Sequence, residues 1–200
     1  MYELLYRGGL TPWVAAGRAQ SALVEHLLDR EEAWHGSTVG RTLVDLGCGT
    51  GEHSLAAAKR GWAVVGLDAS AAAIDKARRA ADGAGLAVRF VVGDVRRLWE
   101  VPGLEPGVSV FVDVGCYHGL RAAGRRMVAE GVGRLAASRS SVLVVGLDRR
   151  PGLAGVGVTA EGLAADFPDW PVEPGQVFAL GGAGPLGRAR FRVFRLAREA

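Results

Sequence analysis

Short apolar runs alternate along this chain with longer segments whose apolar residues recur every three or four positions. The short runs are rich in valine and leucine and predict buried strands, whereas the longer segments predict amphipathic helices. Five strand-helix alternations predict a doubly wound α/β sheet with helices on both faces. The expected strands are 43–46, 62–67, 86–92, 108–114 and 141–147, and the expected helices are 20–34, 52–60, 71–81, 121–138 and 159–167.

The end of the chain follows a different pattern. Two more apolar segments, 176–180 and 190–196, flank a glycine-rich turn and predict an antiparallel hairpin. The sheet is therefore expected to be mostly parallel, with a C-terminal hairpin. A length of 200 residues predicts one domain over 1–200, with a core from 41 to 200.

Composition narrows the class of protein. The net charge is +3, but the arginines are scattered and offset by acids, so no nucleic-acid partner is expected. No apolar window reaches the roughly eighteen residues of a membrane span, and the first residues lack the order of a signal peptide. We therefore expect a cytoplasmic protein without membrane contact. Cys48 and Cys116 lack metal-ligand spacing, so no metal is expected.

A glycine-rich turn follows the first expected strand. Gly47, Gly49 and Gly51 stand at alternate positions, where they allow a tight turn and let a ligand approach the backbone. A dinucleotide fingerprint would place its third glycine at position 52, where this chain has Glu52. Asp45, two residues before the turn, would repel a pyrophosphate but accept hydrogen bonds from an ammonium group. The turn therefore favours a ligand with a cationic amino-acid end.

The segment Val44–Gly51 resembles motif I of the class I S-adenosylmethionine (SAM) dependent methyltransferases. The resemblance implies SAM as the cofactor and a Rossmann-like sheet of seven strands, the last of them antiparallel. An ordinary strand-loop turn is the alternative interpretation of this segment.

Two further acids follow the next two expected strands. Asp68 lies 17 residues beyond Gly51, close to the distance at which an acid binds the ribose hydroxyls of an adenosine ligand. Asp68-Ala69-Ser70 resembles the family's second motif, and Gly93-Asp94-Val95 resembles its Gly-Asp-(Val/Ala/Ile) element, whose carboxylate accepts from the adenine amine. The three acids would then contact the amino group, the ribose and the base. A turn aspartate is the alternative for Asp68, and Ser70 is expected to be the N-cap of the helix 71–81.

The loop after the fourth strand resembles a small-molecule branch of the family, that of the thiopurine and tellurite-resistance methyltransferases. Asp113–Leu120 is similar to its Asp-Arg-Gly-Cys-Phe-His-x-Leu element, although Val114 replaces the arginine and Tyr117 replaces the phenylalanine. His118 has the intrinsic pKa of a general base, and Tyr117 would orient the acceptor. A cofactor contact, a lid contact or a loop hydrogen bond are the alternatives for His118.

Two other segments are expected beside the acceptor. Thr11-Pro12-Trp13 resembles the start of the same branch, in which residues equivalent to 1–40 form a helical cap over the cofactor, and a packing tryptophan is the alternative. The glycine-rich segment 152–158 is expected to be an acceptor-side lid. The expected cofactor-binding residues are Trp13, Asp45, Gly47, Cys48, Gly49, Thr50, Gly51, Asp68, Ala69, Gly93, Asp94, Val95, Asp113 and Gly115, and the expected catalytic residues are Tyr117 and His118.

The sequence thus predicts a SAM-dependent methyltransferase. It would transfer the methyl group by in-line displacement to an oxygen, nitrogen or sulfur nucleophile of a small molecule, a secondary metabolite among them, as a monomer or homodimer. Two alternatives stay open at this point. One is a non-catalytic SAM-binding protein, and the other is an NAD-dependent oxidoreductase, against which the glycine spacing argues.

Overall fold

The computed structural model describes residues 3, 12–148, 157–179 and 190–199, and the side chains of residue 3 and of 23–148, 157–178 and 190–199. The seven strands form one mixed sheet with antiparallel C-terminal strands, as expected, and their order is β3-β2-β1-β4-β5-β7-β6. The chain divides into two compact units, 1–95 and 96–200, which are described separately. The single domain over 1–200 stays a prediction.

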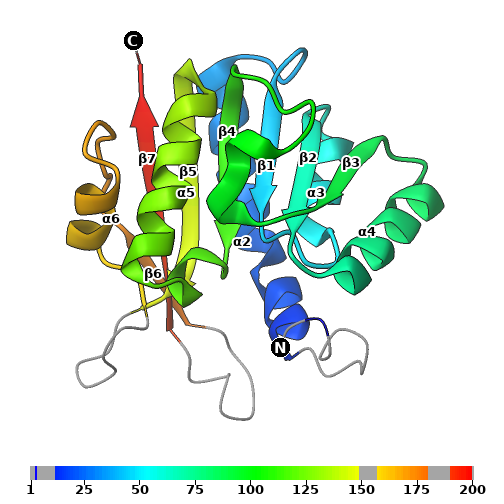
Figure 1. Ribbon diagram of the computed structural model, residues 1–200, viewed down its shortest axis with the longest axis horizontal. Helices are drawn as coiled ribbons and strands as arrows, with labels where there is room; N and C mark the ends of the chain where they lie inside the picture. The colour runs from blue at the N-terminus through cyan, green and yellow to red at the C-terminus, as the bar shows by residue number, and fades with distance from the viewer. Residues whose placement is uncertain (1–2, 4–11, 149–156, 180–189, 200) are drawn as a thin grey trace. The chain divides into compact units, whose positions relative to one another are not determined.

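Unit 1 consists of helix α2 followed by three neighbouring parallel strands with a helix between each strand and the next. β1 pairs with β2, and β2 pairs with β3, both in parallel register (Figure 1). Helices connect consecutive strands, since parallel pairing requires a crossover. The elements are α2 (Pro12–His35), β1 (Thr42–Leu46), α3 (Glu52–Lys59), β2 (Ala63–Asp68), α4 (Ala71–Ala84) and β3 (Val88–Val92). Each expected helix and strand of this region is confirmed.

The aromatic ring of Phe90 fills the core beneath the glycine-rich turn. A Cβ at Gly66 would lie 2.6 Å from a Phe90 ring carbon, and a Cβ at Gly51 would lie 2.7 Å from another. Phe90 also packs in the buried cluster that includes Ile74 and Ala77 of α4. The two missing side chains therefore allow β2, β3 and the turn to pack closely around one ring.

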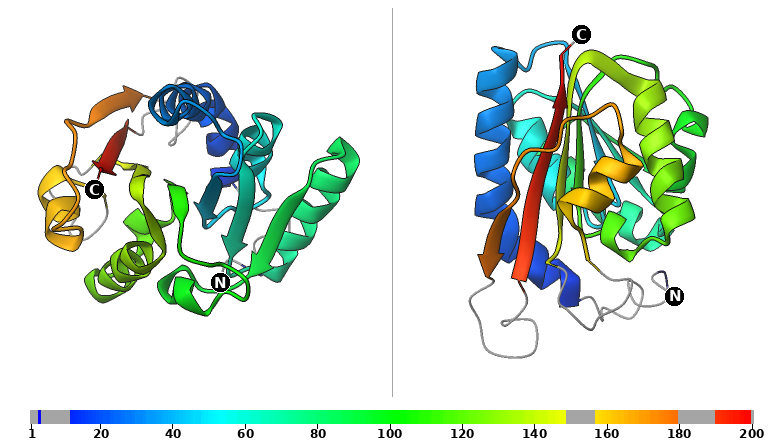
Figure 2. Two further views of the ribbon diagram at one scale, coloured as in Figure 1. Left: turned by 90° about the horizontal axis from the view of Figure 1, so that it is seen from above. Right: turned by 90° about the vertical axis from the view of Figure 1, so that its left-hand side faces the viewer.

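Unit 2 combines one parallel strand pair with an antiparallel C-terminal part. β4 pairs in parallel with β5, whereas β7 pairs antiparallel with β5 on one side and β6 on the other, as the expected hairpin requires (Figure 2). The elements are η1 (Val95–Glu100, which begins at the last residue of unit 1), β4 (Val108–Val114), η2 (Tyr117–Gly119), α5 (Ala122–Leu135), β5 (Ala136–Leu147), α6 (Ala160–Asp166), β6 (Gln176–Ala179) and β7 (Arg190–Arg198).

The boundary between α5 and β5 differs from the prediction. The expected helix reached residue 138 and the expected strand began at Ser141, but β5 begins at Ala136, directly after α5. The first residues of β5 include the exposed Arg139, so they lack the apolar pattern that predicts a buried strand. The short 3₁₀ helices η1 and η2 also have no periodic signal and were not predicted.

Replacement of Gly66 by alanine tests the packing around Phe90. We expect Gly66→Ala to lower the free energy of unfolding by about 1–3 kcal/mol, because its new methyl group overlaps the Phe90 ring. Urea denaturation measures this loss. The control is Gly83→Ala in α4, where a Cβ meets nothing within 4 Å and helix propensity favours alanine by roughly 0.5–1 kcal/mol. Equal effects of the two variants would contradict the packing argument.

Candidate functional site

The turns after β1, β2 and β3 are tied to one another by backbone hydrogen bonds within unit 1. The N–H groups of Gly47 and Cys48 donate to the Leu67 carbonyl at 2.8 and 3.0 Å. The N–H of Gly93 donates to the Asp68 carbonyl at 2.9 Å. Eleven of the expected cofactor-binding residues therefore lie on one connected set of strand ends: Asp45, Gly47, Cys48, Gly49, Thr50, Gly51, Asp68, Ala69, Gly93, Asp94 and Val95.

All three glycines of the first turn adopt left-handed backbone conformations. Their φ angles are 71° at Gly47, 54° at Gly49 and 84° at Gly51, values that disfavour residues with a side chain. The turn leads directly into α3, with Gly51 as its N-cap and no side-chain cap. Backbone N–H groups at such a helix start favour an electron-rich ligand group.

Asp45 is a buried acid under the turn. Its side chain is 1% exposed and accepts a 2.6 Å hydrogen bond from the Ser54 hydroxyl of α3. Burial raises the pKa of Asp45 to about 6, and the Ser54 hydrogen bond partly opposes that rise. Nearby Asp68 raises it further. A cationic ligand group would favour the ionised form of Asp45, which burial disfavours.

Asp68 holds the turn through its carboxylate. One oxygen accepts from the Gly49 N–H at 2.9 Å, and the other accepts from the Ser70 N–H at 2.8 Å. Burial raises the pKa of Asp68, these two hydrogen bonds lower it, and the negative charge of Glu3 raises it. A carboxylate has about four acceptor positions, so the half-buried Asp68 retains capacity for ligand hydroxyl groups.

The start of α4 next to Asp68 is capped twice. The Ser70 hydroxyl accepts from the Ala73 N–H at 3.2 Å, which confirms the predicted N-cap, and donates to the Glu3 carboxylate at 2.6 Å. The N–H of Ala72 also donates to Glu3, at 3.3 Å. Glu3 thus brings a residue from the beginning of the chain to the same strand end as Asp68.

The third strand end presents Gly93 and Asp94. A Cβ at Gly93 would lie 2.7 Å from a methyl carbon of Leu67, so glycine allows this turn to lie against β2. Asp94 is half-buried and directly precedes Val95, the first residue of η1. Its placement beside the Asp68 turn agrees with the predicted group of three acids.

In unit 2, Asp113 organises the loop after β4. Its side chain is 3% exposed, and its two oxygens accept from the N–H groups of Cys116 at 3.2 Å and Tyr117 at 2.8 Å. Gly115, with φ of 88°, donates its N–H to the Val145 carbonyl at 2.9 Å. The predicted cofactor contacts of Asp113 and Gly115 stay predictions, and the observed contacts give both residues a role in shaping the loop.

Tyr117 points its hydroxyl toward α6. The hydroxyl donates a short hydrogen bond to Asp166, and the ring packs against Phe167 with centroids 6.1 Å apart. Burial raises the pKa of Tyr117, and Asp166 raises it further. The side chain is 2% exposed. These contacts anchor the loop to α6 and occupy the hydroxyl that was expected to orient an acceptor.

His118 has the properties of a neutral base. Its Nδ1 atom is buried and has no hydrogen-bond partner among the residues that the structure describes. Burial lowers the pKa of His118, and the positive charge of Arg125 lowers it further, so the imidazole is neutral at pH 7. An unpartnered, neutral ring nitrogen can accept a proton.

Two predicted parts of the site lie mainly outside the described residues. Trp13 falls in the first turn of α2, but its side chain is outside the described part of the chain. The expected lid 152–158 is described only at Gly157 and Val158. Among described residues, no group of three His, Cys, Asp or Glu side chains could hold a metal ion, and no helix is long and apolar enough to cross a membrane.

Ser54 and Asp166 are the site residues that the sequence did not predict. Ser54 is buried in the structure and therefore needs a hydrogen-bond partner. In the sequence, the only signal for it was a polar residue within the alanine-rich part of the helix. Asp166 lies 49 residues from Tyr117, and nothing in the sequence links the two.

Residues 43–138 match a protein family described as Methyltransferase domain. The matched range includes Asp45, Asp68, Asp94 and the loop that carries His118. This part of the chain, just under half of its length, is therefore similar to a methyltransferase domain.

Several solved structures have the same fold. One is a protein from work on the conversion of a disulfide bond into a thioacetal group during echinomycin biosynthesis. It is 25% identical over 84% of this chain and 79% of that chain, with a TM-score of 0.66. The 1,6-didemethyltoxoflavin-N1-methyltransferase of Burkholderia thailandensis, with bound 1,6-didemethyltoxoflavin and S-adenosylhomocysteine, is 17% identical over 100% and 86% of the two chains, with a TM-score of 0.74. TehB from Haemophilus influenzae is 16% identical over 79% and 57%, with a TM-score of 0.64.

The buried Asp45 should make the ligand-free protein less stable as the pH rises. Its pKa is 3.8 in the unfolded chain and about 6 when folded, so stability falls between pH 4 and pH 6, where the unfolded chain releases its proton first. At about 1.4 kcal/mol per pH unit, we expect Asp45→Asn to raise the free energy of unfolding by roughly 3 kcal/mol at pH 7 and by much less at pH 4.

Urea denaturation between pH 4 and pH 7 measures this difference. The control is the exposed Asp82→Asn in α4, which should stay within about 0.5 kcal/mol at every pH. A gain at Asp45→Asn that is independent of pH would contradict the ionisation argument.

Proposed function

We propose that this SAM-dependent methyltransferase transfers a methyl group to an oxygen, nitrogen or sulfur atom of a small molecule. The connected strand ends of unit 1, with Asp45, Asp68 and Asp94, are the observation that carries the proposal. Their chemistry suits a ligand with an ammonium group, a ribose and an adenine. The residues of unit 2 on the loop after β4 act on the acceptor.

The charge of the first turn supports SAM over a dinucleotide. Asp45 lies under the turn and Glu52 stands in the first turn of α3, so two acids flank the place where a pyrophosphate would bind. SAM instead carries a positive ammonium group and a positive sulfonium group. Binding of either charge near Asp45 offsets the unfavourable burial of its carboxylate.

Asp68 and Asp94 account for the nucleoside part of the ligand. Asp68 keeps acceptor capacity beyond its bonds to Gly49 and Ser70, so it can accept from both ribose hydroxyls. Asp94 on the neighbouring turn can accept from the exocyclic amine of adenine. When bound, SAM supplies an activated methyl group that is displaced in line from its sulfonium sulfur.

His118 removes the proton of acceptors that carry one on the nucleophilic atom. The unprotonated nitrogen of its neutral imidazole takes the proton while the nucleophile forms its bond to the methyl carbon. Tyr117 acts as a positioning residue, since its hydroxyl is bound to Asp166. Orientation of the acceptor supplies most of the remaining rate, because the methyl group is already activated.

Calorimetric titration with SAM, S-adenosylhomocysteine and NAD tests the cofactor. We expect micromolar binding of the first two and none of NAD. Asp68→Ala should weaken SAM binding roughly tenfold or more, since hydrogen bonds to a charged acceptor are lost, whereas the exposed Asp75→Ala in α4 serves as the control and should leave it unchanged. Binding of NAD in place of SAM would overturn the proposal.

Turnover of small phenols, amines and thiols separates catalysis from SAM binding alone. We expect His118→Ala to lower kcat about 100-fold with a phenol or amine, and less with a thiol that ionises unaided. SAM affinity should not change. Wild-type kcat should stay flat above pH 6.5 and fall at lower pH as His118 becomes protonated, because its pKa is lowered. Equal losses of SAM affinity in His118→Ala and Asp68→Ala would contradict the separate roles.

A further inference from the structure

Arg125 joins two loops of unit 2 through one guanidinium group. Its Nε donates to the Leu120 carbonyl at 3.0 Å, and its Nη2 donates to the carbonyls of His118 at 3.1 Å and Gly157 at 3.3 Å. The same group lies 5.2 Å from the centre of the Tyr117 ring. Arg125 therefore contacts the loop after β4 at three residues, and also Gly157.

A glycine of β5 brings His118 close to the second of these segments. A Cβ at Gly146 would lie 2.4 Å from a methyl carbon of Val158 and 3.4 Å from the Cβ of His118. Val158 is itself fixed by its N–H, which donates to the Leu147 carbonyl at 3.0 Å. His118 and Val158 can thus both lie on the end of β5, and Arg125 binds the backbone of each segment.

We propose that Arg125 is a positioning residue that locks the loop after β4 to Gly157 and thereby fixes the orientation of His118 toward the methyl acceptor. The inference rests on the proposed function, because it assigns His118 to the acceptor. Only a planar guanidinium with several N–H donors can bind three carbonyl groups and stack on a ring at once. Lysine keeps the charge, but its donors all lie on one nitrogen and it has no planar group to stack on a ring.

The charges around His118 agree with this arrangement. Arg125 from α5 is the nearby cation, and its charge lowers the pKa of His118. The Asp113 carboxylate of β4 accepts hydrogen bonds from the N–H groups of Cys116 and Tyr117. The Asp166 carboxylate of α6 accepts from the Tyr117 hydroxyl. Arg125 therefore helps to keep the imidazole neutral while it holds the loop in place.

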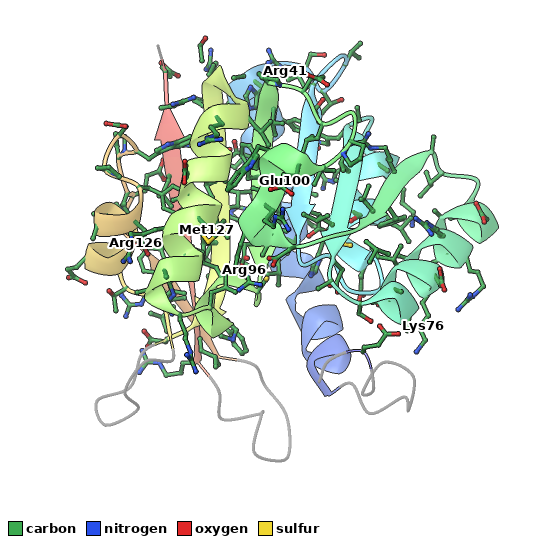
Figure 3. All side chains as sticks on the ribbon, viewed as in Figure 1. Arg41, Lys76, Arg96, Glu100, Arg126 and Met127 are labelled. Carbon is green, nitrogen blue, oxygen red and sulfur yellow. The ribbon has the colours of Figure 1, made fainter. Side chains whose placement is uncertain are left out.

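Arg126 offers a matched control on the same helix. Its side chain is exposed and labelled on α5 beside Met127 in Figure 3. Arg126→Lys makes the same chemical change as Arg125→Lys at a position outside the loop contacts.

Amide hydrogen exchange of the full chain without acceptor tests the lock. The amides of Gly119, Leu120 and Val158 donate to Cys116, Tyr117 and Leu147, so their exchange reports on the two loops. We expect Arg125→Lys to speed exchange at these three amides roughly tenfold or more, and Arg126→Lys to leave them unchanged. Exchange at Gly47 and Cys48, in unit 1, should not change in either variant.

Either of two results would overturn the proposal: unchanged exchange at the loop amides, or a uniform increase that includes Gly47 and Cys48. NMR titration of the His118 ring adds a readout of charge, because Arg125→Met and Arg125→Lys both remove the guanidinium contacts. The pKa of His118 should rise in Arg125→Met and stay near the wild-type value in Arg125→Lys, since only the first removes the charge. A rise of equal size in both variants would contradict the assignment of Arg125 as the cation that faces His118.

These measurements are independent of the cofactor test. If wild-type protein fails to bind SAM, the proposed function fails, whereas faster exchange in Arg125→Lys still identifies the lock. Once an acceptor is known, Arg125→Lys should lower kcat about tenfold or more while the Kd for SAM stays within twofold, because orientation of the acceptor is what is lost. A parallel loss of SAM affinity would overturn the positioning role.

Discussion

The ring of Phe90 occupies the space that side chains at positions 51 and 66 would fill, and the geometry of unit 1 depends on this contact. Because the glycine turn can lie directly on the ring, it stays short and starts α3 at once. The end of β2 then lies within hydrogen-bonding distance of the glycine turn, and the turn after β3 is hydrogen-bonded to Asp68 at that end of β2. A packing constraint in the core thus brings three acids from separate strands together.

The same acids lower the free energy of unfolding when no ligand is bound. Asp45 is buried and accepts a hydrogen bond from the Ser54 hydroxyl, and the neighbouring Asp68 adds a like charge. Burial of an ionisable group opposes folding unless a partner compensates for it. In the proposed function this loss of stability is offset when a cationic ligand binds, a relation that is common at functional sites.

Much of unit 1 could be predicted from the sequence because its signals are local. The strand, the alternate glycines and the acids at successive strand ends lie in short motifs, and parallel strands bring their carboxyl ends to one edge. Ser70 was predicted as a cap for the same reason. The loop after β4 was located correctly, but the direction of Tyr117 was not, since its partner Asp166 lies on a distant helix. The start of β5 at Ala136 could not be predicted from the sequence either. Its first residues pair through their backbones, and exposed side chains such as Arg139 give no apolar pattern.

Asp68 has a consequence that extends beyond its own contacts. Its carboxylate binds the Gly49 N–H and the Ser70 N–H, so it is shared between the glycine turn and the start of α4. A ligand hydroxyl group that donates to Asp68 reduces the negative charge that its carboxylate offers to the Gly49 and Ser70 N–H groups. If Asp68 binds the ribose as proposed, occupancy of the ribose end and the conformation of the turn at the amino-acid end are thermodynamically linked, and by reciprocity each end of the ligand changes the binding of the other by the same factor.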